Sequence, residues 1–299
     1  MAFKAPSAEA VTKAFSGLRG ARFITAGGFK AVYDCTIEGV RQAFKLAYIP
    51  PVTDPHNEEE IAKQKEVLTR VKREIALLGK LKRPEIVKLG KMGPQPVEIN
   101  GDSFVAYSEE FLDGDNLWKI LRKGGTKPTE AELKALFTTL LHAIEEMWSL
   151  KIIHRDIKPC NIIKLNEAAR PFVLLDLGIA YVIGETALTH AGVPATHRYI
   201  APEMLRPDFR ETLDYRSDLY TTALTIYEYA AQRHPIAGDP EDMMITISRA
   251  LRDTPSSLHG CRPDLSEAFC NVIDQLLKKR PALRPGNLQM LLQQAGVAP

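Results

Sequence analysis

Residues 154–161 read His154-Arg155-Asp156-Ile157-Lys158-Pro159-Cys160-Asn161. They follow an amphipathic helical pattern and precede two apolar runs, Ile162–Leu165 and Phe172–Leu175, which a short polar segment joins. This order predicts a loop that leads into a β-hairpin. The second run ends in Asp176-Leu177-Gly178. We therefore expect the polar side chains of both segments in loops at strand ends, where they can meet a ligand without burial in the core.

These loops combine two carboxylates and one amide oxygen, from Asp156, Asp176 and Asn161. Oxygen donors of this kind suit Mg²⁺, which usually keeps water and substrate phosphates in its other positions. The pattern therefore predicts a magnesium site next to the hairpin.

The chain changes character near residue 115. Before it lie short segments with strand-type patterns: Arg22–Thr25, Ala31–Ile37, Val40–Ala47, Ile86–Met92 and Ser103–Ser108. After it, helical periodicity dominates, at Glu130–Leu150, Asp218–Gln232, Pro240–Arg252 and Ser266–Lys278. We expect an α+β fold in which a small β-rich lobe with one long helix precedes a larger helical lobe, with the ligand bound between the lobes.

The long helix of the first lobe is expected to begin after Asn57, a good N-cap that is followed by three glutamates in the first turn. Its apolar positions recur at helical spacing, and Glu74 falls on the same face as Val71 and Leu78. A lone carboxylate in an apolar seam is costly to bury. Glu74 therefore needs a cationic partner, unless it lies at the edge of the seam and reaches solvent.

Composition excludes several classes of protein. The 299 residues carry 39 Lys and Arg against 37 Asp and Glu, a net charge of +2, so we expect no nucleic acid and no membrane surface as the main partner. No apolar stretch is long enough to cross a bilayer, and the N-terminus lacks a secretory h-region. The four scattered cysteines fit reduced thiols and a cytoplasmic protein rather than a zinc site or a disulfide scaffold.

The pattern H-R-D-x-K-x-x-N resembles the catalytic loop of the eukaryotic-type Ser/Thr protein kinases. Other family motifs follow in order: Lys45 in a strand, Glu74 in the long helix, Asp176-Leu177-Gly178, Ala201-Pro202-Glu203, Asp218 at the start of an apolar helix, and Arg284. The resemblance covers about residues 20–290 and implies the bilobal protein kinase fold. It divides the chain into an extension (1–20), an N-lobe (21–112) and a C-lobe (113–299).

The resemblance implies transfer of the γ-phosphate of ATP, with Mg²⁺, to Ser or Thr hydroxyls of protein substrates. Asp156 would orient the attacking hydroxyl and accept its proton, and Lys158 would stabilise charge on the γ-phosphate. Asn161 and Asp176 would hold Mg²⁺. Lys45 would bind the α- and β-phosphates, held in place by an ion pair to Glu74.

The nucleotide-binding segments depart from the family pattern. The glycine-rich loop falls on Thr25–Val32, where only the middle glycine is kept, as Gly27, with Gly28 beside it. Thr25 and Lys30 replace the outer two glycines, and Lys30 could lend a charge to the nucleotide. In the hinge, the backbones of Glu110 and Leu112 would bind adenine, which puts Glu109 at the gatekeeper position unless the alignment is shifted by one residue. The residues implied to bind ATP are Gly27, Gly28, Phe29, Val32, Ala43, Lys45, Glu110 and Leu112.

Further residues carry scaffold or regulatory roles in the family. His154 would be structural, Glu203 and Arg284 would form a buried ion pair, and Asp218 would brace the catalytic loop. Arg155 would bind a phosphate on the activation segment, where Thr189 or Thr186 would be autophosphorylated. Lys158 and Thr196, seven residues before Glu203, favour serine and threonine over tyrosine as acceptors. Since Asn116 and Cys160 are uncharged, we expect no strong preference for arginine before the acceptor residue.

Two alternatives stay open. The altered glycine loop and Glu109 fit a pseudokinase, a nucleotide-binding or scaffolding module with little transfer activity, although every catalytic residue is present. A small-molecule kinase of the antibiotic phosphotransferase type would share the Asp…Asn…Asp arrangement but generally lacks the Ala-Pro-Glu segment found here at Ala201–Glu203. The kinase-only layout would also suit a separately encoded regulatory partner.

Overall fold

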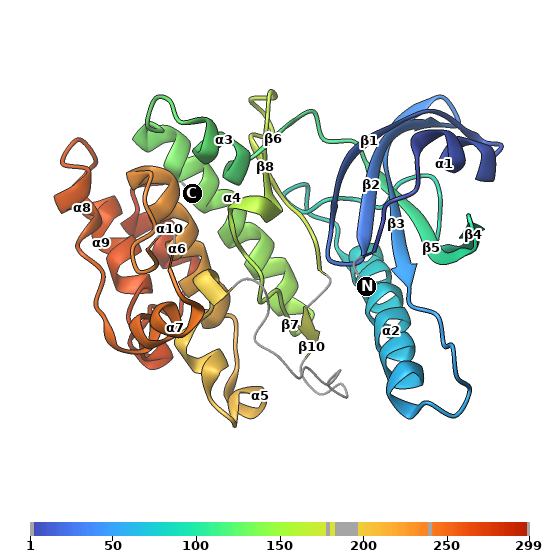
Figure 1. Cartoon of the computed structure of the whole chain (residues 1–299). Coiled ribbons are helices and arrows are strands. Elements are labelled where there is room, and N and C mark those ends of the chain that lie inside the picture. Colours follow the sequence, from blue (N-terminus) through green and yellow to red (C-terminus); the bar gives the residue numbers. More distant parts are fainter. Residues whose placement is uncertain (1–2, 178–179, 183–196, 239–240, 298–299) are drawn as a thin grey trace. The chain divides into compact units, whose positions relative to one another are not determined.

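The computed structural model describes residues 3–177, 180–182, 197–238 and 241–297, and they fall into two compact units. Unit 1 comprises Met1–Lys82 and Val87–Asp113, and unit 2 comprises Arg83–Ile86 and Gly114–Pro299. The first is built on an antiparallel sheet and the second is mainly helical, which confirms the predicted α+β class (Figure 1).

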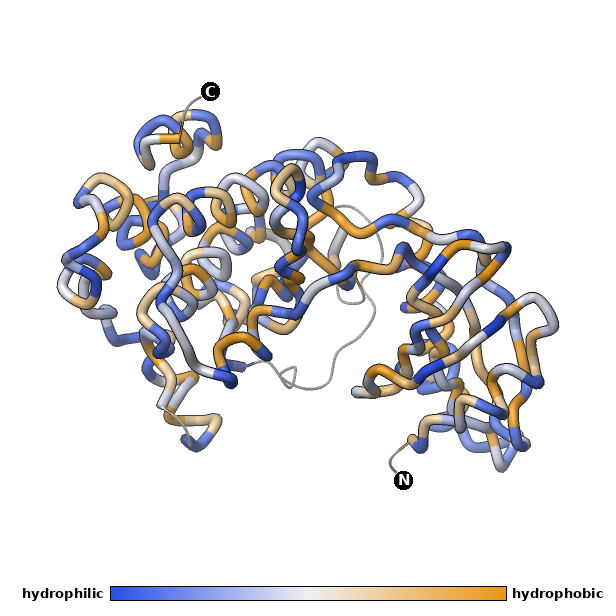
Figure 2. The backbone as a smooth tube through the Cα atoms, turned by 90° about the horizontal axis from the view of Figure 1, so that it is seen from above, coloured by the Kyte–Doolittle hydropathy of each residue, from blue (hydrophilic) through white to orange (hydrophobic). Residues whose placement is uncertain are grey.

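Unit 1 contains a five-stranded antiparallel sheet of order β1-β2-β3-β5-β4 and two helices. Its elements are α1 (Ala8–Ala14), β1 (Leu18–Gly27), β2 (Lys30–Ile37), β3 (Val40–Ile49), α2 (Glu58–Lys80), β4 (Gln95–Ile99) and β5 (Asp102–Glu110). Strands alternate between apolar and polar residues in Figure 2. Because successive side chains of a strand point to opposite faces, each face of this sheet can carry its own cluster.

One face packs on α1, and the other packs on α2. The α1 side buries Val11, Phe15, Tyr33, Phe44 and Phe104. The α2 side buries Ala47, Ile49, Val71, Ile75 and Tyr107. Lys45 is two residues from Ala47, and Glu109 is two residues from Tyr107. Because residues two apart in a strand point to the same face, Lys45 and Glu109 also lie on the α2 side.

Helix α2 begins as predicted. The Asn57 side chain accepts hydrogen bonds from the backbone N–H groups of Glu59 and Glu60 and so satisfies two of the orphan donors of the first turn. Val71, Glu74 and Leu78 are buried on one face. The expectation that Glu74 lies inside the protein is confirmed, since only 1% of its surface is exposed.

The predicted strand at Ile86–Met92 is wrong, and β4 was not anticipated. Within this segment only isolated bridges form, Ile86 to Leu174 and Leu89 to Glu109. Its hydrogen bonds to β3 and β5 mix backbone and side-chain groups: Gly90 N donates to Ser108 O and Ser108 N to Met92 O, while Gln42 Oε1 accepts from Lys91 N and Ser108 Oγ accepts from Met92 N. A Cβ on Gly90 would approach the same two side chains within 2.4 Å, so this arrangement requires glycine.

Unit 2 contains two small sheets, of order β6-β8-β9 and β10-β7, among helices. Its strands are β6 (Gly114–Asn116), β7 (Ile152–Ile153), β8 (Ile162–Leu165), β9 (Phe172–Leu174) and β10 (Tyr181–Val182). Its helices are α3 (Leu117–Lys123), α4 (Glu130–Ser149), α5 (Phe209–Thr212), α6 (Arg216–Ala231), α7 (Met243–Arg252), α8 (Leu258–Cys261), α9 (Glu267–Leu276) and α10 (Leu288–Gln294). Short 3-10 turns lie at Pro159–Asn161, His197–Tyr199, Pro202–Leu205 and Pro281–Leu283.

Helices α4 and α6 form the core of unit 2, and fourteen of the sixteen residues of α6 are buried. A helix that is buried on nearly all sides needs few charged residues, and Asp218 and Glu228 are the acidic ones on α6. The predicted β8–β9 hairpin is confirmed, because Ile162 pairs with Leu174 and Lys164 with Phe172. Among the described helices none is long and apolar enough to span a membrane.

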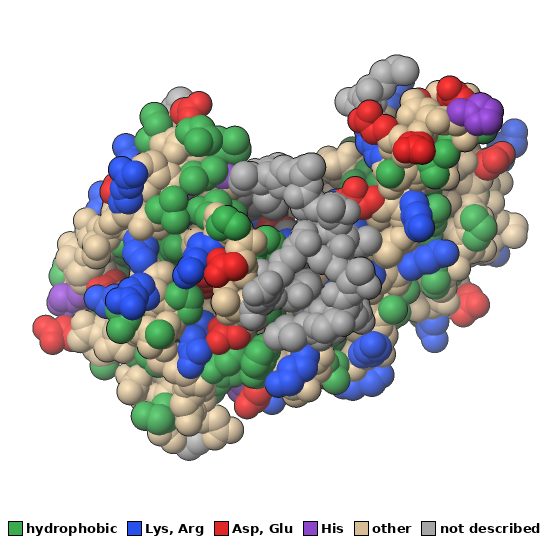
Figure 3. Space-filling model, turned by 90° about the horizontal axis from the view of Figure 1, so that it is seen from below, with side chains coloured by type: hydrophobic (Ala, Val, Ile, Leu, Met, Phe, Trp, Pro, Cys, Tyr) green, Lys and Arg blue, Asp and Glu red, His purple; other side chains and the backbone are tan. Residues whose placement is uncertain are grey.

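The surface carries mixed charge. On the face drawn in Figure 3, Lys and Arg side chains are interspersed with Asp and Glu side chains. All four cysteines are free thiols, of which Cys35 and Cys270 are buried and Cys160 is exposed.

Candidate active site

The catalytic-loop residues of unit 2 converge on the carboxylate of Asp156. Lys158 Nζ lies 2.8 Å from Asp156 Oδ2, and Asn161 Nδ2 donates to the same oxygen at 2.9 Å. Asn161 Nδ2 also donates to the backbone carbonyl of Asp156 at 2.9 Å. These contacts fix the orientation of the Asp156 carboxylate through Oδ2.

Backbone hydrogen bonds bring the Asp176 segment next to the catalytic loop. Leu175 N donates to Asn161 O at 2.8 Å, and Leu175 O contacts His154 Nε2 at 3.0 Å. Asp176, the next residue, has a positive φ of 59°, a left-handed conformation that short polar residues adopt more readily than others. The chain therefore turns sharply at Asp176 immediately beside Asn161, and Leu177 is buried.

Asp218 of α6 braces the loop from below, as predicted. Its Oδ2 accepts from His154 N at 2.8 Å and its Oδ1 from Arg155 N at 2.9 Å. Burial raises the pKa of this carboxyl, while the charge of His154 and the two backbone donors act in the opposite direction. His154 is itself completely buried, and its Nδ1 accepts from Asp156 N at 3.2 Å, which agrees with a structural role.

The predicted buried ion pair of unit 2 is also present. Arg284 Nη1 donates to Glu203 Oε1 at 2.6 Å, and Arg284 Nη2 donates to Glu203 Oε2 at 2.9 Å. Ser217 Oγ donates to Glu203 as well. The Ala-Pro-Glu segment is thereby tied to the start of α6 and to the C-terminal part of the unit.

The residues that would hold Mg²⁺ have suitable chemistry. Because Asn161 directs its amide nitrogen to Asp156, its amide oxygen points away from that residue, and the adjacent Asp176 supplies a carboxylate. Two such oxygen donors match a Mg²⁺ ion that takes its remaining positions from water and phosphate. No group of three or more His, Cys, Asp and Glu side chains that could hold a metal occurs among the described residues.

In unit 1, the glycine-rich loop is a tight hairpin. Gly27 pairs with Lys30, so that Gly28 and Phe29 form a two-residue turn, and Gly28 has a φ of 58°. A Cβ built on either glycine would meet no atom within 4 Å, which leaves the backbone of the turn accessible. The Phe29 carbonyl accepts from Tyr48 N at 2.7 Å and anchors the turn to β3.

Three other predicted nucleotide-binding residues of unit 1, Val32, Ala43 and Lys45, share one sheet face. Val32 is opposite Lys45 in the β2–β3 register, and Ala43 is opposite Glu109 in the β3–β5 register. Directly opposite residues of an antiparallel pair lie on the same face, so Val32, Ala43 and Lys45 point in one direction. The Glu110 backbone N–H donates to Lys88 O at 2.9 Å, so its carbonyl is the group that could accept from a ligand.

The predicted ion pair between Lys45 and Glu74 is wrong. Lys45 Nζ lies 2.6 Å from Glu109 Oε1, and Glu74 Oε2 lies 2.5 Å from Lys30 Nζ. Tyr107, which belongs to no sequence motif, donates from its hydroxyl to Glu74 Oε1 at 3.0 Å. The prediction that a buried Glu74 has a cationic partner is confirmed, but the partner is Lys30 of β2 and not Lys45 of β3.

Glu109 itself, and not a neighbour displaced by one residue, occupies the position next to Lys45. Its side chain is 3% exposed. Burial raises the pKa of Glu109, against which the charge of Lys45 acts to lower it. Strand alternation was the signal for this contact, since Tyr107 and Glu109 are two residues apart and lie on the side of β5 that faces α2.

Some predicted residues lie outside the described part of the chain. Thr186, Thr189 and Thr196 fall within residues 183–196. Arg155 is described, has a positive φ of 69°, and places its guanidinium 5.8 Å from the centroid of the Phe209 ring.

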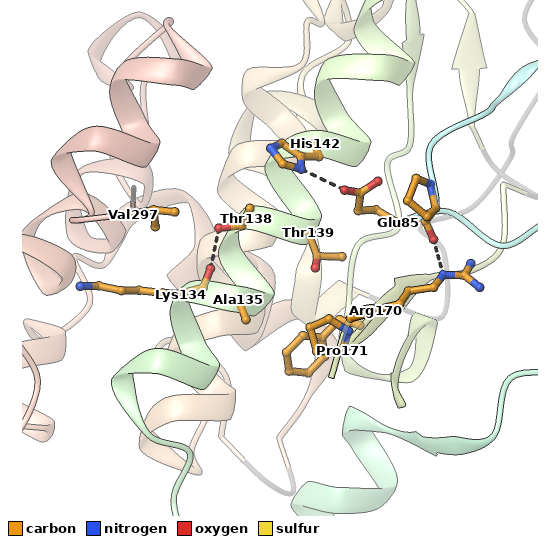
Figure 4. Close-up of a pocket in the computed structure, with 12 residues that line it drawn as sticks. Glu85, Lys134, Ala135, Thr138, Thr139, His142, Arg170, Pro171 and Val297 are labelled. Carbon is orange, nitrogen blue, oxygen red and sulfur yellow. Dashed lines mark hydrogen bonds and ion pairs between the residues drawn. The ribbon is translucent and has the colours of Figure 1, made fainter. Parts of the chain in front are cut away.

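A separate cavity of about 360 Å³ lies in unit 2 and contains none of the predicted site residues. Lys134, Thr138 and His142 line it from α4, and Arg170 and Pro171 border it from the β8–β9 connection (Figure 4). His142 Nδ1 contacts Glu85 Oε1 at 2.9 Å across this cavity.

The comparisons with known proteins agree with these motifs. Residues 22–295 match the family model of the protein kinase domain. The chain is similar to the serine/threonine-protein kinase PknJ of Mycobacterium tuberculosis, with 28% identity over 274 residues that cover 90% of this chain and 43% of that protein. It is similar to PknH of the same species, with 27% identity over 87% of this chain and 38% of that protein.

A third relative is the probable serine/threonine-protein kinase PknB of Bifidobacterium longum, 31% identical over 58% of this chain and 25% of that protein. The chain thus spans less than half the length of these curated relatives.

Proposed function

Because this chain belongs to the protein kinase family, we propose that it transfers the γ-phosphate of ATP to serine and threonine hydroxyls of protein substrates in a Mg²⁺-dependent reaction. The observation that carries this proposal is the arrangement around Asp156. Lys158 and Asn161 both contact Asp156 Oδ2, and Asp176 follows the residue that is hydrogen-bonded to Asn161. This is the set of groups that phosphoryl transfer needs for a base, a charge-stabilising cation and a metal site.

In the proposed reaction, Asp156 Oδ1 accepts the hydrogen bond of the acceptor hydroxyl and takes its proton as the oxygen attacks the γ-phosphorus. The contacts of Lys158 and Asn161 to Oδ2 hold the carboxylate in one rotamer, which lowers the entropic cost of orienting the hydroxyl. Lys158 also places its ammonium where negative charge develops on the transferred group. The bond between the γ-phosphorus and the bridging oxygen breaks, and ADP leaves with that oxygen.

The proposed Mg²⁺ site is formed by Asn161 and Asp176. When bound, the ion would neutralise charge on the β- and γ-phosphates. The chain itself contributes the orientation of the two donors. Asn161 is fixed by its two hydrogen bonds to Asp156, and Asp176 by the turn that begins at Leu175.

We propose that the nucleotide is held by residues of unit 1. The backbone of the Gly27–Phe29 turn would approach the phosphates, and the carbonyl of Glu110 and the backbone of Leu112 would bind adenine. Val32 and Ala43 would line the sheet face beside them. The accessible turn and the shared orientation of these side chains support this assignment.

The preference for serine and threonine rests on Lys158 in the catalytic loop and on the names of the relatives, which are serine/threonine kinases. We further propose that Thr189 or Thr186 is autophosphorylated and that Arg155 binds the resulting phosphate. The partner that this function requires is a protein substrate, and a separately encoded regulatory partner would be compatible with it.

The Lys45–Glu109 ion pair favours a second candidate, a pseudokinase. A lysine whose charge is already compensated by a buried carboxylate offers less to a polyphosphate. In that case the chain would bind nucleotide or a partner protein without transferring phosphate.

Transfer of γ-phosphate from labelled ATP with Mg²⁺, to the chain itself and to a mixture of proteins, tests the proposal. Asp156→Asn should abolish the label, because it removes the base. Glu167→Gln is the matched control, since Glu167 is an exposed carboxylate in the β8–β9 connection of the same unit. Nucleotide binding without label in the unmodified protein would support the pseudokinase instead.

A further inference from the structure

Four charged side chains gather on the face of the unit 1 sheet that packs on α2. Lys30 is opposite Ala47 and Val32 is opposite Lys45 in the β2–β3 register. Lys45 is opposite Tyr107 and Ala43 is opposite Glu109 in the β3–β5 register. Because directly opposite residues share a face, Lys30, Lys45 and Glu109 all point toward the side from which α2 contributes Glu74.

Both oxygens of the Glu74 carboxylate have partners other than Lys45. Lys30 Nζ contacts Oε2 at 2.5 Å, and the Tyr107 hydroxyl donates to Oε1 at 3.0 Å. Lys45 Nζ lies 5.7 Å from the centroid of the Tyr107 ring, so this ring lies beside the lysine while its hydroxyl occupies Glu74. Both oxygens of Glu74 are thereby assigned to other partners.

Lys45 forms its ion pair with Glu109 instead. The two side chains are 10% and 3% exposed, and their 2.6 Å contact compensates two charges that would otherwise be buried alone. Withdrawing Lys45 from this pair would leave the Glu109 carboxylate without a counter-charge in a buried position, which is unfavourable.

The strand positions of Lys30 and of Glu109 lie at different levels of this face. Lys30 is level with Ala47 of β3, whereas Glu109, the partner of Lys45, is level with Ala43. Four residues of extended strand separate these levels, a distance of about 13 Å. The Gly28–Phe29 turn immediately precedes Lys30, and Glu110 immediately follows Glu109. In the proposed nucleotide site the turn is the phosphate end and Glu110 the adenine end.

We propose that Lys30, oriented by Glu74, is the lysine that binds the nucleotide phosphates in this chain, and that Glu109 retains Lys45 as a structural ion pair. The inference rests on the proposed function, since it assumes that unit 1 binds ATP. Lys30 has three N–H donors and its side chain is 14% exposed. It can therefore keep its contact with Glu74 and donate to a phosphate oxygen.

The test compares the affinities of ATP and of adenosine by calorimetry with Mg²⁺ present. Adenosine lacks the phosphates, so the ratio of the two dissociation constants isolates the phosphate contacts. Lys30→Met should raise the dissociation constant of ATP about 10- to 100-fold, the range of one charge-assisted hydrogen bond. The dissociation constant of adenosine should change by less than about twofold. Lys45→Met/Glu109→Gln, which removes both members of the other pair, should keep the ratio within about threefold of the unmodified protein.

Two further variants test whether a loss of ATP affinity comes only from the lower net charge or from a loss of stability. Lys13→Met removes one positive charge from the exposed surface of α1 in the same unit and should leave the ratio unchanged. If Lys30→Met is too unstable to assay, Lys30→Met/Glu74→Gln removes the charge left behind and should show the same loss of ATP affinity. Thermal unfolding of each variant checks that it is folded.

The inference is overturned if Lys30→Met keeps the ratio, or if Lys45→Met/Glu109→Gln loses ATP affinity as strongly as Lys30→Met. Both of those results would leave the proposed kinase function intact. An unmodified protein that binds neither ATP nor adenosine would overturn the proposed function together with this inference.

Discussion

Arg284 and Glu203 are 81 residues apart in the sequence and share two hydrogen bonds in the interior of unit 2, at 2.6 and 2.9 Å. The arginine side chain is completely buried and the glutamate is 6% exposed. Each charge is therefore tolerated only because the other is present.

Arg284→Met should destabilise the protein by about 3–5 kcal/mol, because it leaves the Glu203 carboxylate buried without its counter-charge. Urea unfolding followed by circular dichroism measures the change. Lys119→Met provides the control, since Lys119 pairs with Asp115 at 2.5 Å but is 60% exposed, and its loss should cost less than about 1 kcal/mol. Equal effects of the two variants would refute the importance of the buried pair.

Asp218→Asn should lower the rate of phosphoryl transfer even at temperatures where the variant is still folded. The two carboxylate oxygens of Asp218 accept hydrogen bonds from the backbone N–H groups of His154 and Arg155. In asparagine one of these oxygens becomes an NH₂ group, which cannot accept a hydrogen bond from the N–H group that faces it. We expect a stability loss of about 1–3 kcal/mol, the cost of an unsatisfied buried donor. At a temperature where the variant remains folded, its turnover should still be at least about tenfold lower, as the catalytic loop is no longer fixed.

The measurement for Asp218→Asn is steady-state transfer of phosphate beside a thermal melt. Asp208→Asn, at an exposed carboxylate of the same unit, should match the unmodified protein in both. Loss of turnover in proportion to the unfolded fraction alone would contradict the bracing role.

His234 should make stability depend on pH. Its Nδ1 accepts from Ile236 N at 3.1 Å and Ala237 N at 2.8 Å, so the ring must stay unprotonated there. Burial, together with the charge of Arg198, lowers the pKa of His234 from 6.5 to about 3. Between these values the unfolded chain binds more protons than the folded one, so stability is lost as the pH falls.

From pH 7 to pH 5 we expect this histidine to contribute a loss of up to about 2 kcal/mol. His234→Asn offers a side-chain oxygen that can accept the two N–H groups but does not titrate, so the dependence should flatten by that amount. Urea unfolding at both pH values, for both proteins, measures it. The same slope in the variant would show that another group is responsible.

Peptide substrates with arginine two or three residues before the acceptor should not be strongly preferred. Asn116 is neutral and caps α3, accepting from Lys119 N at 2.7 Å, and the exposed Cys160 carries no carboxylate. Replacing such an arginine by alanine should change kcat/KM by less than about fivefold, the effect of one exposed ion pair. A peptide array measures this preference, and Cys160→Glu should create it where the unmodified protein shows none.

Local sequence patterns were sufficient for elements that depend on neighbouring residues. Asn57 and the glutamates after it specified the start of α2, and the alternation of the apolar runs specified the β8–β9 hairpin. Helix α3 was not anticipated, although Asn116 followed by Leu117, Ile120 and Leu121 is a capping residue before an apolar helical pattern. The segment 86–92 resembled a strand because of its apolar content. That content gives no sign that the side chains of Gln42 and Ser108 accept hydrogen bonds from its backbone.

The sequence by itself determined which residues carry the chemistry, because Asp156, Lys158, Asn161 and Asp176 stand at fixed spacings in two loops that a short hairpin joins. It also predicted that Glu74, if buried, has a cationic partner, since a carboxylate in an apolar helix face is costly to bury alone. Only the tertiary structure decided which cation that is. The register of β2, β3 and β5 places Lys30 and the Tyr107 hydroxyl on Glu74 and leaves Lys45 to Glu109. Charge pairing depends on distances between strands that are far apart in sequence, and those distances exist only once the sheet has formed.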